Sequence, residues 1–352
     1  MSQFLRPALS ALDPYVPGEQ PQDKRYIKLN TNENPYPPAP GVMDAITREA
    51  VSQLKLYSDP TIAPLKQAIA DCYAIKPENV FVTNGSDEAL GFAFLAYADG
   101  SHPVTIPDIS YGFYKVFADL YGLDYEAIPL RDDFSINPSD YISKGKNIVI
   151  ANPNAPTGLC LSIEDIEKIV SSNPRNIVVI DEAYVDFGGE SAVELTKKYD
   201  NLMVVQTFSK SRSLAGARLG FAIAHSDIIK DMEKIKYSTN PYNVNRLTLT
   251  MGAEAIADKE YFTARCAQIK EAREYTQNAL TELGFTVLDS KANFVFAKSD
   301  KIGGKELYLE LKERGILVRH FTNAKICDFN RITIGTMEDM QSLVETIKEI
   351  LN

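Results

Sequence analysis

A lysine stands shortly after an apolar run, in the segment Thr207–Phe221, TFSKSRSLAGARLGF. Hydroxyl side chains precede Lys210, and Arg218 stands eight residues after it. Burying an ammonium group is costly unless the group is paired or neutral, so a strand-end lysine usually extends to solvent. The hydroxyls and the arginine instead favour an anion site beside an amine. Such a site suits a phosphorylated aldehyde bound as a Schiff base.

A carboxylate and a phenol follow a second apolar run in the segment Asn176–Phe187, NIVVIDEAYVDF. In an open α/β sheet, ligands bind outside the carboxyl ends of the strands. Asp181 at such an end would pair with a protonated pyridine nitrogen and keep the ring an electron sink. Tyr184 follows three residues later. The alternative for Asp181 is an N-cap of the next turn.

Two loops after apolar runs supply further polar groups. In Phe81–Leu90, FVTNGSDEAL, the run breaks at Asn84-Gly85, and Ser86 opens a helix whose first N–H groups would bind an anion. In Ala151–Gly158, ANPNAPTG, two prolines and a glycine predict a rigid loop whose asparagines would bond a ring substituent. Each segment alone is also compatible with an ordinary turn.

The elements that position these residues are short apolar runs between helix-like stretches. Unbroken apolar runs are typical of strands buried on both faces, and helical crossovers between them indicate mostly parallel pairing. The sequence therefore predicts an α/β fold with a mostly parallel sheet flanked by helices. The expected strands are residues 80–83, 104–107, 148–151, 177–180, 202–205 and 221–224.

The pattern changes after residue 250. Residues 258–283 contain no glycine or proline, which predicts a long helix ending before Gly284. Short strands are expected at 285–288, 294–297, 316–319 and 332–334, with helices near 305–314 and at the C-terminal end. We therefore expect an extended N-terminal arm over 1–38, a large domain over 39–250 and a smaller α+β domain over 251–352.

Composition excludes several classes of protein. The 352 residues include 37 basic and 47 acidic side chains, a net charge of −10 that disfavours nucleic acid and anionic membranes as partners. The longest apolar stretch, residues 91–98, is too short to span a bilayer, and the N-terminus lacks a signal-peptide core. Four scattered cysteines and three isolated histidines predict reduced thiols in the cytoplasm and no metal site.

The segments NGSDE, PNAPTG, DEAY and SK(x)3LAG(x)R, in this order, resemble the fold-type I aminotransferases that use pyridoxal 5′-phosphate. The resemblance covers nearly the whole chain. The segments PYVPG, LNTNENPYPP, SYGFY and NRITIG are similar to those of histidinol-phosphate aminotransferases. The resemblance implies a transfer of the amino group of L-histidinol phosphate to 2-oxoglutarate in histidine biosynthesis.

The resemblance also implies a role for each matching residue. Lys210 would be the Schiff-base lysine and proton shuttle, Asp181 would hold the pyridine nitrogen, and Tyr184 would hold the phenolic oxygen. Tyr111 would stack on the ring. The cofactor phosphate would lie among Gly85, Ser86, Asp87, Thr207, Ser209 and Arg218. Asn32, in the LNTNENPYPP segment, and the arginines Arg319 and Arg331 would contact the substrate, the arginines through its anionic group.

A homodimer with shared active sites is a further implication of the resemblance. Tyr57 matches a tyrosine that reaches the cofactor phosphate of the partner, and Tyr15 on the arm would likewise cross to the partner's substrate. One position departs from the family pattern, because Ala155 stands where PNNPTG has its second asparagine. That asparagine normally bonds the phenolic oxygen, so either Asn154 takes over or Tyr184 acts alone.

Other functions remain open at the level of sequence. An aromatic amino-acid aminotransferase or a threonine-phosphate decarboxylase would use the same cofactor residues, and Tyr15 and Tyr111 would accept other aromatic rings. A regulator that keeps the fold as a ligand sensor would carry an additional DNA-binding domain. A purely structural protein would not need Lys210, Asp181 and Arg218 together.

Overall fold

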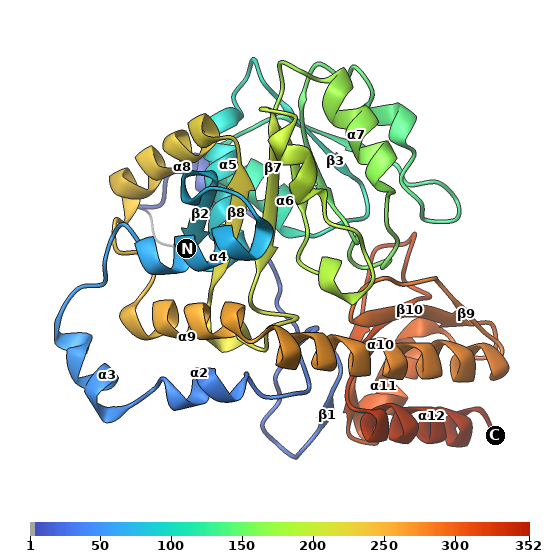
Figure 1. Cartoon of the computed structure of the whole chain (residues 1–352). Coiled ribbons are helices and arrows are strands. Elements are labelled where there is room, and N and C mark those ends of the chain that lie inside the picture. The colour runs from blue at the N-terminus through green and yellow to red at the C-terminus, as the bar shows by residue number, and fades with distance from the viewer. Residues whose placement is uncertain (1–3) are drawn as a thin grey trace.

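The computed structural model describes residues 4–352 and contains a seven-stranded sheet with helices on both faces (Figure 1). The strand order is β2-β8-β7-β6-β5-β3-β4, and β8 alone runs antiparallel to its neighbours in this sheet. The strands are β2 (Val80–Thr83), β3 (Val104–Pro107), β4 (Tyr125–Ile128), β5 (Asn147–Ala151), β6 (Val178–Asp181), β7 (Leu202–Thr207) and β8 (Gly220–Ala224).

The mostly parallel α/β sheet expected from the sequence is confirmed. All six apolar runs form strands, although β6 begins one residue later than predicted. Every residue of these six strands is buried, which explains why they read as unbroken apolar runs. The edge strand β4 was missed because three of its four residues are exposed or half-buried, so its sequence, YEAI, is mixed.

Successive strand residues point to opposite faces of the sheet and enter two separate cores. Val178 and Ile180 pack on one side and Val179 on the other. The first core lies under α4 (Ala63–Tyr73), α7 (Ile163–Ser172) and α9 (Arg246–Ala257). The second lies under α5 (Ser86–Tyr97), α6 (Phe113–Tyr121) and α8 (Ser226–Thr239).

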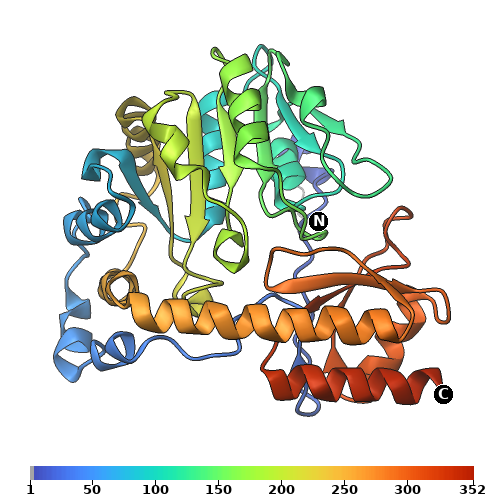
Figure 2. The ribbon, with the colours of Figure 1, turned by 45° about the vertical axis from the view of Figure 1, so that its right-hand side comes forward.

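The C-terminal part contains a four-stranded antiparallel sheet with the order β12-β13-β10-β9. The long helix α10 (Lys259–Glu282) runs beneath the large sheet and continues along this smaller one (Figure 2). Gly284, with φ +89°, follows it as expected from the sequence. The remaining elements are β9 (Phe285–Val287), β10 (Phe294–Ser299), α11 (Gly304–Glu313), β11 (Ile316–Leu317), β12 (Arg319–His320), β13 (Asn330–Thr333) and α12 (Met337–Leu351).

Two sequence expectations are corrected here. Residues 316–319 do not form one strand, because β11 pairs with β1 (Ile27–Lys28) whereas β12 pairs with β13. The chain changes partner at Val318, and an apolar run does not encode the strand with which it pairs. The second correction concerns the strand expected at 332–334, which lies at Asn330–Thr333.

The N-terminal segment is not wholly extended, since it contains the short helix α1 (Pro7–Ser10) before the strand β1. After it come α2 (Pro40–Asp44) and α3 (Arg48–Ser52). Short 3₁₀ turns are η1 (Gln53–Lys55), η2 (Pro77–Asn79), η3 (Pro138–Tyr141), η4 (Val185–Phe187), η5 (Ala192–Lys197) and η6 (Ala215–Ala217). The domain boundaries at residues 38 and 250 remain a proposal. Within residues 4–352, no helix combines the length and apolar character that crossing a membrane requires.

Candidate active site

A cavity of about 360 Å³ lies at the carboxyl ends of β6 and β7, where the N-terminal arm and the strands β12 and β13 also reach. This volume lies within the range of small-molecule sites. Every site residue expected from the sequence lines it except Gly85, Asn154 and Tyr57. The predicted residues on its wall are Tyr15, Asn32, Ser86, Asp87, Tyr111, Asp181, Tyr184, Thr207, Ser209, Lys210, Arg218, Arg319 and Arg331.

Lys210 follows β7 and points into the cavity. Its Nζ donates a hydrogen bond to the carbonyl oxygen of Thr31, 3.1 Å away, and lies 5.9 Å from the centre of the Tyr184 ring. Burial and, second to it, the positive charge of Arg331 lower the pKa of Lys210 to about 8. A substantial fraction of this amine is therefore neutral near physiological pH, as a nucleophile or general base requires.

Asp181 is the last residue of β6 and is buried. Its Oδ2 accepts a hydrogen bond from the Tyr114 hydroxyl at 2.7 Å, and its Oδ1 accepts one from the N–H of Ala183 at 3.1 Å. Burial raises the pKa of Asp181 to about 6, although both hydrogen bonds act in the opposite direction. A cation placed against this carboxylate would favour its ionised form.

Tyr184 is supported by a residue from the arm. Its hydroxyl oxygen accepts a hydrogen bond from Nδ2 of Asn32 at 2.9 Å, which leaves the phenolic proton free to be donated into the cavity. Burial raises the pKa of Tyr184, so the hydroxyl stays protonated at neutral pH. Asn32 is itself held by Thr333, whose Oγ1 donates to Asn32 Oδ1 at 3.0 Å. The sequence expected Asn32 at the substrate, which stays a prediction; Asn32 lines the cavity and also holds Tyr184.

The start of α5 forms an anion-binding corner. Gly85 adopts φ +76°, and a Cβ built on it would lie 2.6 Å from Nη2 of Arg218, so only glycine fits there. Arg218 lies 3.1 Å from Oδ2 of Asp87, and the hydroxyls of Thr207 and Ser209 are 2.9 Å apart beside it. Backbone N–H groups of a helix start, hydroxyls and a guanidinium together suit a phosphate group.

Two arginines lie side by side on the opposite wall of the cavity. Arg319 and Arg331 are directly paired residues of β12 and β13. Arg319 donates to the carbonyls of Val16 and Pro17 at 3.0 and 3.1 Å, and Arg331 donates to that of Asn30 at 3.1 Å. Like charges opposite each other are destabilising, and the buried Nε of Arg331 has no partner. Both features favour an anionic ligand between them.

Asn154 and Tyr15 lie elsewhere than the sequence suggested, whereas Tyr57, expected to serve the partner's site, stays a prediction. Asn154 is buried beside the cavity, but its amide donates to Ile109 and Thr157, and Ala155 takes the place on the wall. Tyr57 is 78% exposed and stacks on Tyr242, away from the cavity. Tyr15 reaches the cavity of its own chain, packing 4.5 Å from Phe113 between ring centres, whereas the sequence predicted a crossover to the partner.

Sequence reasoning missed several contributors. Asn30, Thr31 and Glu33 line the cavity from the LNTNENPYPP segment, which had been recognised without assigning them roles. Tyr114, fully buried against Asp181, stands in the segment SYGFY. The segments LNTNENPYPP and SYGFY were the only indication in the sequence that these residues belong to the site. Their spacing along the chain does not predict a contact with residues of β6 and β7. Among the described residues, no group of three or more His, Cys, Asp or Glu side chains could hold a metal ion.

Known proteins are similar to this chain in sequence and in fold. The family model of the class I and II aminotransferases matches residues 24–347. The chain is 51% identical to the histidinol-phosphate aminotransferase of Brachyspira hyodysenteriae, covering 100% of this chain and 99% of that one. It is 48% identical to that of Marinomonas sp., with 99% and 100% covered. The Sinorhizobium meliloti histidinol-phosphate aminotransferase, solved with pyridoxal-5′-phosphate, shares its fold with a TM-score of 0.91 at 24% identity over 100% and 98%.

The chain therefore belongs to the class I and II aminotransferases, enzymes with the fold-type I architecture. Within that family its full-length relatives place it among the histidinol-phosphate aminotransferases.

Proposed function

We propose that the protein transfers the amino group of L-histidinol phosphate to 2-oxoglutarate, reversibly, as a step of histidine biosynthesis. The observation that carries this reaction is a single cavity with Lys210 and Asp181 on one wall and two arginines on the other. The alternating access of two substrates to one site predicts ping-pong kinetics.

The cavity fits pyridoxal 5′-phosphate as cofactor. The corner formed by Gly85 and Arg218 would receive the phosphate, Asp181 the ring nitrogen and Tyr184 the phenolic oxygen. Asn32 already donates to the hydroxyl oxygen of Tyr184, so the hydroxyl proton of Tyr184 points to the cavity. It would bond the cofactor's phenolic oxygen without an asparagine at the position of Ala155. When bound, the cofactor supplies an aldehyde that captures amino groups and a protonated ring that withdraws electrons.

The chain's own groups manage the protons of the reaction. The Nζ of Lys210 would take a proton from the substrate's α-carbon and then pass it to the carbon of the cofactor's aldehyde group. The lowered pKa of Lys210 favours this role as general base. Asp181, held by Tyr114, would keep the positive charge on the ring nitrogen. Tyr15 and Pro17, whose carbonyl accepts from Arg319, line the same cavity as Lys210.

Substrate recognition would rest on the arginine pair. Histidinol phosphate has no α-carboxylate, so Arg319 and Arg331 would bind its phosphate, and the same guanidinium groups would bind the carboxylate of 2-oxoglutarate. The rings of Tyr15 and Tyr111, 6.1 Å apart between centres, would offer an aromatic surface to the imidazole. Phenylalanine would fit this surface too, but it lacks the phosphate.

A spectroscopic half-reaction tests this assignment. We expect histidinol phosphate, without 2-oxoglutarate, to abolish the visible absorption of the cofactor-loaded protein at a concentration about a hundredfold lower than phenylalanine needs. The reason is that only histidinol phosphate pairs a phosphate with both arginines. If phenylalanine acts at an equal or lower concentration, the chain is an aromatic aminotransferase instead.

The pKa of Lys210 predicts a pH profile for cofactor attachment. Only the neutral amine reacts, so the rate at which apo-protein attaches pyridoxal 5′-phosphate should rise with pH and level off above a midpoint of about 8. Because Arg331 lowers this pKa, Arg331→Gln should move the midpoint upward and slow attachment at neutral pH. Stopped-flow absorbance measures the rate, with Arg319→Gln as the matched control. A midpoint that stays or falls in Arg331→Gln would refute the electrostatic coupling.

A homodimer with shared active sites is part of the proposal. Tyr57 is exposed and directed away from its own cavity, beside the exposed apolar side chains of Val51, Leu54 and Leu56. This arrangement suits a tyrosine presented to a second copy of the chain. Sedimentation of the protein across a dilution series distinguishes a dimer from a monomer, and a fully active monomer would contradict shared sites.

We also propose that the enzyme works in the cytoplasm with its cysteines reduced. In the part of the chain that the structure describes, Cys72, Cys160, Cys266 and Cys327 are all free. Burial raises the pKa of Cys266 to about 12, so this thiol stays protonated at neutral pH.

A further inference from the structure

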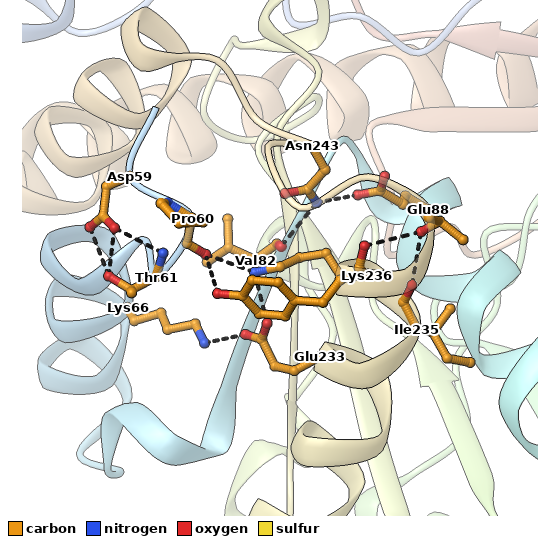
Figure 3. A network of polar contacts seen from close by, with 12 residues as sticks. Asp59, Pro60, Thr61, Lys66, Val82, Glu88, Glu233, Ile235, Lys236 and Asn243 are labelled. Atoms are coloured by element: carbon orange, nitrogen blue, oxygen red, sulfur yellow. Dashed lines mark hydrogen bonds and ion pairs between the residues drawn. The ribbon is translucent and has the colours of Figure 1, made fainter. Parts of the chain in front are cut away.

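The loop of residues 240–245 joins α8 to α9 and contacts two segments that carry predicted cofactor residues. One is the turn before α5, with Asn84 and Gly85, and the other is the segment 57–61. Figure 3 shows Asn243 beside Glu88, with Pro60, Lys236 and Glu233 in the same polar network. The proposed mechanism gives these groups no role, although they lie directly behind the anion-binding corner.

Asn243 is hydrogen-bonded to the start of α5 and the turn before it through its side-chain amide and its backbone carbonyl. Its Nδ2 donates to Oε2 of Glu88 at 2.5 Å, and its backbone carbonyl accepts from Nδ2 of Asn84 at 3.0 Å. Oε2 of Glu88 also accepts from the backbone N–H of Asn84 at 2.7 Å. Asn243 itself is only 5% exposed, so its side chain is largely shielded from water although Asn84 lies at the surface.

The same stretch of chain holds the other side of the corner. Oγ1 of Thr248, in the first turn of α9, donates to the carbonyl of Ala217 at 3.1 Å, directly before Arg218. Asn245 caps this helix by accepting from the N–H of Thr248 at 2.9 Å. The residues that follow Asn243 therefore fix the backbone that presents the Arg218 guanidinium.

The segment that carries Tyr57 is attached to the same region. The ring of Tyr57 stacks on that of Tyr242 with centres 4.5 Å apart, and Arg246 donates to the Tyr57 carbonyl at 2.9 Å. The fully buried Lys236 donates to the carbonyl of Pro60 at 3.0 Å and pairs with Glu233 at 2.7 Å. Segment 57–61 and the turn before α5 thus share one support.

We propose that Asn243 is a positioning residue for the cofactor phosphate, acting through Glu88 and Asn84 on the turn that begins α5. Anion binding at a helix start depends on backbone N–H groups that converge on one point. The amide of Asn243 and the N–H of Asn84 both donate to Oε2 of Glu88, so this carboxylate links the loop to the turn and holds the backbone of Asn84 and Gly85 in place. This inference rests on the proposed function, because it takes pyridoxal 5′-phosphate as the occupant.

Titration of apo-protein with pyridoxal 5′-phosphate tests the inference by the dissociation constant. We expect Asn243→Ala to raise this constant about ten- to hundredfold, since a buried hydrogen bond to a charged group is lost. At saturating cofactor, the fold decrease in kcat should be smaller than the fold increase in the dissociation constant for pyridoxal 5′-phosphate. Inorganic phosphate, used as a competing ligand, should lose affinity in parallel.

Asn79→Ala is the control, because the Asn79 amide also joins two segments at β2, at its opposite end, by donating to the Ala224 carbonyl at 2.9 Å. It should lower the thermal midpoint comparably but change the dissociation constant by less than about twofold. If Asn243→Ala does not fold, Glu88→Ala and Glu88→Gln replace it. The alanine should weaken cofactor binding, and the glutamine, which still accepts both hydrogen bonds, should restore it.

An unchanged dissociation constant in Asn243→Ala, or equal weakening in Asn79→Ala, would overturn the inference while leaving the proposed function intact. Failure of the wild-type protein to bind pyridoxal 5′-phosphate would instead overturn the proposed function. The two failures are therefore distinguished by the wild-type titration alone.

Discussion

Lys210→Ala is expected to abolish turnover, lowering kcat by about 10⁴-fold or more, because the variant loses both the amine that holds the cofactor and the proton carrier. Lys210 is the lysine on the cavity wall, and burial lowers its pKa to about 8. Steady-state turnover with histidinol phosphate and 2-oxoglutarate measures the loss.

Two controls separate this chemical role from a structural one. The anion corner of Arg218 and Gly85 stays intact in Lys210→Ala, so the variant should still retain pyridoxal 5′-phosphate without a covalent bond. Lys198→Ala removes an exposed lysine that pairs with Glu167 and should leave turnover unchanged. Multiple turnovers at a near-normal rate in Lys210→Ala would refute its assignment.

Asp181→Asn is expected to lower kcat by about 10²- to 10³-fold, the range found when a preorganised electrostatic partner is removed from an active site. The neutral amide cannot hold a positive charge on the ring nitrogen. The substitution preserves the volume of a buried side chain at the end of β6, so the thermal midpoint should change little. The rate of the half-reaction with histidinol phosphate measures the effect directly.

Tyr114→Phe offers a graded comparison. The Tyr114 hydroxyl bond lowers the pKa of Asp181, so its removal raises that pKa further above the ordinary carboxyl range. A carboxyl with a raised pKa loses its charge at a higher pH, so the acid limb of the pH–rate profile should move to higher pH.

For Asp181→Asn, a rate within about threefold of wild type would show that Asp181 takes no part in the chemistry.

Local sequence determined the strands and the ends of the long helix. The strands β2, β3 and β5–β8 are buried throughout and mostly apolar, and a sheet covered on both faces satisfies such runs. The polar residues at their carboxyl ends then had to meet at one edge. This is why Lys210, Asp181 and Ser86 could be placed together from the sequence and are found on one cavity.

The partners of each side chain were decided by tertiary structure. Asn32 supports Tyr184 across 152 positions of the chain, and Asn154, expected at the cofactor, turns its amide to its own loop instead. Neither choice follows from residue type, because an asparagine amide is satisfied equally well by a ring substituent or by a carbonyl.

The sequence by itself therefore determined on which edge of the sheet the candidate site residues stand, since periodicity and strand ends are local properties. Only the tertiary structure decided that Arg319 and Arg331 face each other, that Tyr15 enters the cavity of its own chain, and that Asn243 supports the anion corner. These contacts join segments far apart along the chain. Hydrogen-bond direction and close packing select among several equally plausible partners, and that selection exists only once the chain has folded.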